Sequence, residues 1–110
     1  MSPSELLRRY ILLHNLGIET GEFEPLLQLF KDDAVMEFEN PKIGEFTGIE
    51  IIRGIFRRQP PMMAIAIGEI VESDCIAKAD YIIEDEPEVR QGYLSMEIDD
   101  DKIQKLYIGL

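Results

Sequence analysis

The sequence contains one cysteine, one histidine and no tryptophan. Cys75 has no partner within the chain, which argues against a disulfide scaffold and favours a cytoplasmic location, where thiols stay reduced. One cysteine and one histidine also provide no paired spacing for zinc. The acidic runs at 84–88 and 99–101 lack the spaced ligands and central glycine of a calcium loop, and no glycine-rich phosphate loop follows a strand. The sequence therefore predicts neither a metal ion nor a cofactor.

Basic residues are scarce. Lysine and arginine number 11 against 22 acidic residues, so the net charge is −11. Proteins bind nucleic-acid phosphates and anionic lipids mainly through Lys and Arg, so this charge argues against both partners. No apolar run approaches the ~20 residues of a membrane-spanning helix, and the N-terminus lacks the apolar core of a signal peptide. We expect no nucleic-acid partner, no membrane partner and no export from the cytoplasm.

The remaining composition is that of a globular protein, with 45% hydrophobic and 30% charged residues among 110. This length supports one hydrophobic core, so residues 1–110 are predicted to form a single domain. The strongest break is the pair Pro60-Pro61. Apolar residues before it recur mostly at helical spacing, whereas those after it follow the spacing of strands. Such segregation predicts an α+β fold with helices packed on one face of an antiparallel sheet.

Three helices are expected before the double proline. The first begins after Ser4 as N-cap, is weakened by Gly17, and ends at Gly21 or gives way there to the next loop. The second is short and has Pro25 in its first turn. The third follows Thr47, which would cap it, and ends before the double proline.

A strand is predicted over 34–39, between the second and third helices, because its apolar residues alternate with polar ones. Four more strands are predicted after the double proline, over residues 62–71, 75–84, 89–98 and 103–110. The first of these four is apolar at almost every position, which is typical of a strand covered on both faces.

The string LLQLFKDDAVMEF, followed by GEFTGIEIIRGIF, resembles the nuclear transport factor 2-like superfamily, which includes ketosteroid isomerases and SnoaL-type polyketide cyclases. The resemblance covers essentially the whole chain. It implies a cystatin-like cone in which three N-terminal helices pack in a strongly curved, mostly antiparallel sheet. It also implies an apolar pocket between the helices and the sheet, and dimers formed through the outer sheet face. The superfamily hosts unrelated chemistries, so the resemblance specifies the fold better than the function.

The resemblance to the isomerases implies three catalytic positions. Their first-helix tyrosine falls on Tyr10 or His14, their aspartate base falls on Phe38, and their protonated late-strand aspartate falls on or next to Tyr93. A phenyl ring cannot abstract a proton. The nearest polar substitutes are Glu39, which should face away from Phe38 in a regular strand, and Asn40. The sequence therefore predicts no steroid isomerisation by that route.

His14 follows Tyr10 by one helical turn on the apolar face of the first helix. An imidazole beside a phenol can serve as acid, base or ligand-orienting donor, or both can simply be hydrogen-bonded in the core wall. Farther along, Tyr81, Tyr93 and Glu97 could line the concave face of the sheet together with Ser95. Alternatively, Glu97 is solvated or pairs with Lys105 across the last hairpin.

Arg53 and Arg57 lie one turn apart on the third predicted helix, with Arg58 next in sequence. They could bind a carboxylate or phosphate ligand. Alternatively, and in better agreement with their position, they pair with local acids such as Glu50 on a solvated face, where ion pairs contribute little. The methionines provide adaptable apolar surface, which suits a pocket or a core.

These observations favour a small-molecule-binding domain of the SnoaL-like type. Its expected pocket wall consists of Tyr10, His14, Phe38, Tyr81, Tyr93 and Glu97. One alternative is a metal-free isomerase, cyclase or hydrolase acting on a small apolar substrate, and another is a structural dimerisation module with a filled pocket. We also expect a homodimer through the outer sheet face, burying several of Ile65, Ile67, Ile76, Ile82 and Ile108.

Overall fold

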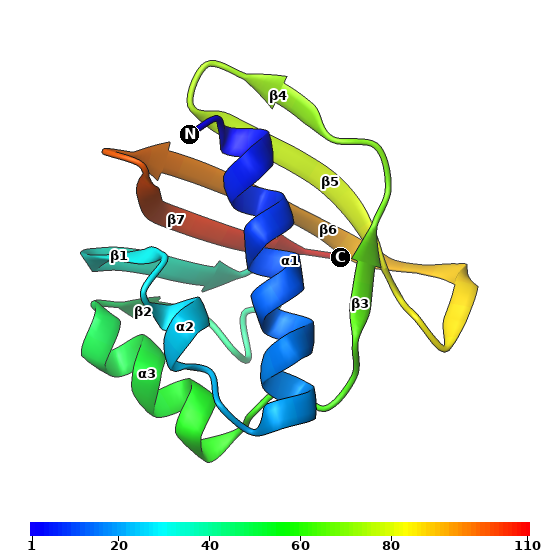
Figure 1. Cartoon of the computed structure of the whole chain (residues 1–110), viewed down its shortest axis with the longest axis horizontal. Coiled ribbons are helices and arrows are strands. Elements are labelled where there is room, and N and C mark those ends of the chain that lie inside the picture. The colour runs from blue at the N-terminus through cyan, green and yellow to red at the C-terminus, as the bar shows by residue number, and fades with distance from the viewer.

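Three helices lie against one face of a curved sheet of seven strands (Figure 1). The structure is a computed structural model and describes residues 1–110. The elements in chain order are α1 (Pro3–Thr20), α2 (Glu24–Leu27), β1 (Phe30–Phe38), β2 (Glu45–Thr47), α3 (Ile49–Arg58), β3 (Ile65–Ile67), β4 (Val71–Ser73), β5 (Ile76–Ile83), β6 (Glu86–Asp99) and β7 (Lys102–Gly109). The predicted α+β class and the three N-terminal helices are confirmed.

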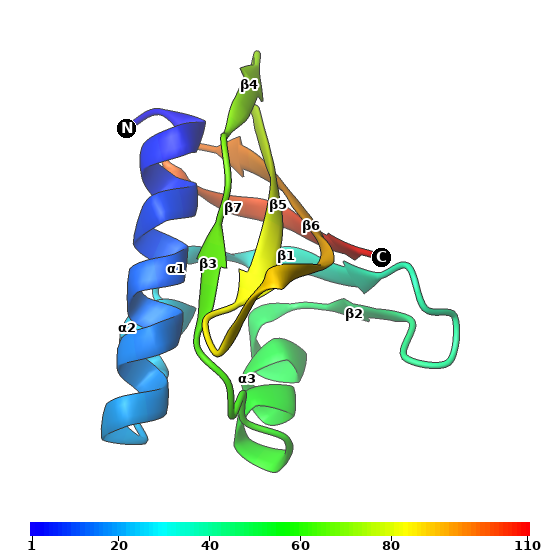
Figure 2. The ribbon, with the colours of Figure 1, turned by 90° about the vertical axis from the view of Figure 1, so that its right-hand side faces the viewer.

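The strand order is β2-β1-β7-β6-β5-β3, with β4 paired to β5. All neighbouring strands are antiparallel except β1 and β7, which run parallel. Register shifts interrupt the β5–β6 ladder on both sides of Ile82 and the β6–β7 ladder between Glu97 and Ile98. Such irregularities bend strands, and Figure 2 shows the sheet curving beside α1 and over α3.

The core lies between α1 and the concave face of the sheet. Helix α1 contributes Leu6, Leu7 and Tyr10, whose spacing places them on one face of the helix. The central strands contribute alternate residues: Ala77 and Ala79 from β5, Leu94 and Met96 from β6, and Ile103 and Leu106 from β7. No helix of this chain has both the length and the hydropathy needed to cross a membrane.

The helix starts differ from those expected. Ser2, not Ser4, caps α1, because Ser2 Oγ accepts the Glu5 N–H at 3.1 Å. Ser4 Oγ instead donates to Glu72 at 2.7 Å and thereby ties α1 to β4. Helix α3 begins after Gly48 without a side-chain cap, because Thr47 belongs to β2 and pairs with Val35.

The prediction of one covered strand over 62–71 is wrong. Only Ile65–Ile67 pairs with β5 there, and Val71–Ser73 forms a separate strand farther along the same neighbour. Ile65 lies opposite Ile83, the last residue of β5, so Met62 and Met63 lie beyond the end of that ladder. Their side chains are 85% and 58% exposed. Apolar composition alone could not show where the partner strand ended.

Candidate functional site

An apolar cavity of about 220 Å³ lies between α1, α3 and the concave face of the sheet. Its wall consists of Tyr10, His14, Met36, Phe38, Phe56, Pro61, Ile65, Tyr81, Leu94 and Ile108. The wall contains no carboxylate. Its potential hydrogen-bonding side chains are two phenols and one imidazole, which come from α1 and β5.

Four of the six residues expected in the pocket wall line this cavity: Tyr10, His14, Phe38 and Tyr81. Tyr10 and His14 lie one turn apart on α1, and their ring centroids are 6.1 Å apart. Phe38 is the last residue of β1, where its ring packs edge-on against Phe46 at 6.3 Å.

Tyr93 and Glu97 do not line the cavity, and their expected place in its wall is wrong. Side chains alternate along β6, and its buried residues Leu94 and Met96 face the helices. Tyr93 and Glu97 therefore project from the outer face, together with Ser95. The sequence signal was present: the set with Leu94 and Met96 is the more apolar one and should cover the core.

The outer-face residues interact with one another. The Tyr93 ring lies 5.9 Å from that of Tyr107, and the Lys78 ammonium lies 4.3 Å above Tyr93. Glu97 lies opposite Lys105 in the β6–β7 ladder, and Lys105 forms an ion pair with Glu37 at 3.0 Å. The position of Glu97 therefore agrees with the alternative in which it lies next to Lys105 across the last hairpin.

Asn15 determines which nitrogen of His14 carries the proton. Its Nδ2 donates to the Ile65 carbonyl at 2.8 Å, and its Oδ1 accepts the Ile65 N–H at 3.0 Å, so the amide has only one possible orientation. His14 Nδ1 lies 2.9 Å from the same Oδ1. Because that oxygen can only accept, Nδ1 must donate, and neutral His14 keeps the lone pair of Nε2 as an acceptor.

Burial keeps all three polar groups of the cavity uncharged. Desolvation lowers the pKa of His14, although its hydrogen bond to Asn15 opposes the shift. Burial likewise raises the pKa of Tyr10 and of Tyr81, with Arg90 opposing the shift at Tyr81. The Tyr10 hydroxyl and His14 Nε2 have no partner within the protein. Since no fully buried side-chain N or O atom lacks a partner, we infer that both atoms are accessible from the cavity.

A titration of His14 should therefore have its midpoint below the ordinary histidine value of about 6.5. In the window below that value, the unfolded chain binds the proton more readily than the folded chain does. The free energy of unfolding should consequently decrease as the pH falls through this window. Two-dimensional NMR of the imidazole gives the midpoint, and a value above 7 would contradict the assignment of a neutral, desolvated ring.

Two residues of this site were not among those expected from the sequence. Asn15 is the first: nothing in the sequence connects it with Ile65, 50 residues away. Phe56 is the second: it lines the cavity from α3. Glu39, a polar substitute considered for the isomerase base, is exposed and accepts the Leu110 N–H at 2.6 Å. No group of three or more His, Cys, Asp or Glu side chains is arranged to hold a metal ion.

The fold is shared with solved structures of low sequence identity. An NTF2-like protein from Anabaena variabilis superposes with a TM-score of 0.73 and 15% identity, covering 98% of this chain and 90% of the other. A putative polyketide cyclase from Sinorhizobium meliloti gives 0.64 and 18%, covering 91% and 93%. A putative ketosteroid isomerase from Kribbella flavida gives 0.64 and 15%, covering 94% and 76%.

No protein-family model and no curated protein match the sequence. The structural similarities confirm the nuclear transport factor 2-like cone fold that the sequence motif indicated. At 15–18% sequence identity, these similarities establish the fold alone, because proteins of this fold have different activities.

Proposed function

We propose that this protein binds a small, mostly apolar molecule in the cavity between α1, α3 and the sheet. The observation that carries the proposal is an apolar cavity into which few polar groups converge, the usual composition of a ligand site. The apolar wall supplies binding energy by excluding water, and the polar groups fix the orientation of the ligand. A cavity that remains open favours this function over a dimerisation module with a filled pocket.

The protonation states define the complementary ligand. Neutral His14 offers Nε2 as an acceptor, so the ligand should carry an O–H or N–H donor there. The phenols of Tyr10 and Tyr81 remain protonated and can donate to a ligand oxygen. A flat aromatic alcohol meets both requirements. We place the protein in the cytoplasm as part of this proposal, which agrees with its exposed free thiol, Cys75.

Calorimetry with 2-naphthol tests this function. We expect binding that weakens roughly five- to tenfold in His14→Leu, because the ligand hydroxyl loses its acceptor. Phe38→Ala should change the affinity more than Arg58→Ala, since Phe38 lines the cavity and Arg58 lies outside it. An affinity for 2-naphthol that is equal in the natural protein and in His14→Leu and Phe38→Ala would place binding elsewhere.

A metal-free isomerase, cyclase or hydrolase remains the second candidate, and one observation favours it. A neutral imidazole with a free Nε2 in an apolar cavity is suited to general-base chemistry. The steroid route lacks its base, because Phe38 occupies that position. The cavity is also smaller than the roughly 300–1,000 Å³ of drug-sized ligand sites. Turnover of a 5-ene-3-keto steroid should therefore stay at background, and turnover abolished by His14→Leu would support this candidate instead.

We further propose a homodimer through the outer sheet face, which no helix covers (Figure 2). Three of the isoleucines expected in the interface are not available for it. Ile65 and Ile108 line the cavity, and Ile67 packs against the core. Ile76, which is 40% exposed, and Ile82 remain available. Sedimentation at roughly tens of micromolar should show a dimer that Ile76→Lys weakens, whereas a sharply monomeric species would contradict the proposal.

A further inference from the structure

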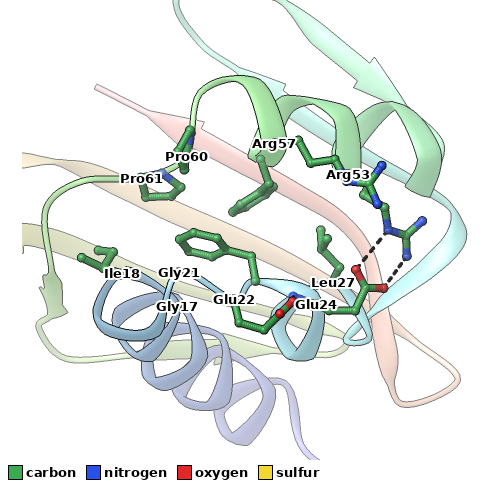
Figure 3. A pocket seen from close by; sticks show the side chains of 12 residues that line it. Gly17, Ile18, Gly21, Glu22, Glu24, Leu27, Arg53, Arg57, Pro60 and Pro61 are labelled. Atoms are coloured by element: carbon green, nitrogen blue, oxygen red, sulfur yellow. Dashed lines mark hydrogen bonds and ion pairs between the residues drawn. The ribbon is translucent and has the colours of Figure 1, made fainter.

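A second and larger cleft, of about 500 Å³, lies where the end of α1, α2 and α3 meet (Figure 3). Two of its lining residues are aromatic, Phe23 and Phe56, and their rings lie 5.5 Å apart. Gly17 allows this arrangement: a Cβ there would lie 2.4 Å from the Phe23 ring, so only glycine lets that ring rest on α1. These two rings offer an apolar surface beside the charged residues of the cleft.

The cleft contains one arginine that no carboxylate contacts directly, although the pKa of Glu24 is lowered by its hydrogen bond from Arg53 and, to a smaller extent, by the charge of this arginine. Arg53 donates to both carboxylate oxygens of Glu24, at 2.7 and 3.2 Å (Figure 3). It also pairs with Glu50, so its charge is balanced. Arg57 lies one turn later on α3, lines the same cleft and is exposed. It forms no ion pair or hydrogen bond with another side chain. A ligand carboxylate could form an ion pair with the Arg57 guanidinium without displacing an existing partner.

The cleft and the inner cavity share part of their walls. Phe56 and Pro61 line both spaces. Because only side chains separate the two spaces, a rotation of the Phe56 ring could open a passage between them. A flexible hydrocarbon chain needs a narrower passage than a fused ring system does. The inner cavity alone lies below the usual size range of ligand sites, whereas the outer cleft lies within it.

We propose that the two spaces form one site for an unbranched apolar carboxylate, with the carboxylate on Arg57 and the chain passing Phe56 into the inner cavity. This inference rests on the proposed function, because the end of the chain occupies the same inner cavity. Glu22 also lines the cleft, and Glu24 lies beside Arg53. These acids disfavour a second negative charge, so the site selects a monoanion over a phosphate or a dicarboxylate.

Calorimetry with straight-chain carboxylates from hexanoate to decanoate tests the proposal. Each methylene group that becomes buried should tighten binding about fourfold. Arg57→Gln should weaken decanoate binding roughly tenfold and leave that of 1-decanol within about twofold, because only the carboxylate uses the charge. Arg58→Gln is the matched control, since Arg58 lies outside the cleft, and it should change neither affinity.

Competition shows whether the two spaces form one site. 2-Naphthol in the inner cavity should compete more strongly with decanoate than with hexanoate, because the longer chain extends farther past Phe56. Simultaneous binding of decanoate and 2-naphthol, or equal effects of Arg57→Gln and Arg58→Gln, would overturn this inference and leave the proposed function intact. Failure of 2-naphthol to bind at all would reject the proposed function, and this inference would fall with it.

Discussion

Gly92→Ala should be the most damaging single substitution of a small residue in this protein. A Cβ at Gly92 would lie 2.1 Å from the Gly109 carbonyl oxygen and 3.2 Å from the Tyr81 ring. The first neighbour is backbone of the adjacent strand, so relief requires β6 and β7 to separate. We expect the free energy of unfolding to fall by more than about 3 kcal/mol, the upper range for overpacking. Urea denaturation followed by circular dichroism measures this loss.

The function should change as well, because the Tyr81 ring lies over Gly92 and lines the cavity. If the variant folds, its affinity for 2-naphthol should decrease together with its stability. Gly68→Ala is the matched control: nothing lies within 4 Å of the added Cβ. It should change the free energy of unfolding by less than about 1 kcal/mol. Equal stabilities of the two variants would show that the close approach of β6 and β7 is not required.

Asn15→Ala should have the second largest effect. The amide holds both backbone groups of Ile65 and accepts from His14, so its removal leaves three polar groups without their partners. Because water can reach part of this region, we expect a loss of about 2–3 kcal/mol. The Ile65 amide hydrogen should exchange much faster, since β3 has only three residues and pairs with β5 alone. Hydrogen exchange by NMR and urea denaturation provide the two measurements.

Asn15→Asp separates the two roles of this residue. It keeps an acceptor for the Ile65 N–H and for His14, but it loses the donor to the Ile65 carbonyl. A carboxylate beside the imidazole favours the charged ring, so the pKa of His14 should rise in this variant. An Asn15→Ala protein with unchanged stability and exchange would show that the amide does not hold β3. An unchanged His14 midpoint in Asn15→Asp would contradict the contact between the two side chains.

Local periodicity determined much of the fold. Leu6, Leu7 and Tyr10 recur at helical spacing and form the buried face of α1, and Ala77 and Ala79, two residues apart, share the buried side of β5. The pairing of Tyr10 with His14 is also local, since residues four apart on a helix lie on the same face. The segregation of helices before the double proline from strands after it indicated the α+β class.

Contacts between distant segments decided the rest. Alternation shows which residues of a strand share a face, but packing against the helices decides which face becomes concave. For this reason Tyr93 and Glu97 lie on the outer face of the sheet and not in the cavity wall. The partner of Asn15 is 50 residues away, and Arg53 is neutralised by Glu24 from α2, 29 residues away. Because Glu24 pairs with Arg53, Arg57 has no ion-pair partner. The sequence thus determined the elements and their apolar faces, because those depend on neighbours along the chain. Only the tertiary structure decided which polar groups meet at the cavity and the cleft, because those depend on how the sheet curves around the helices.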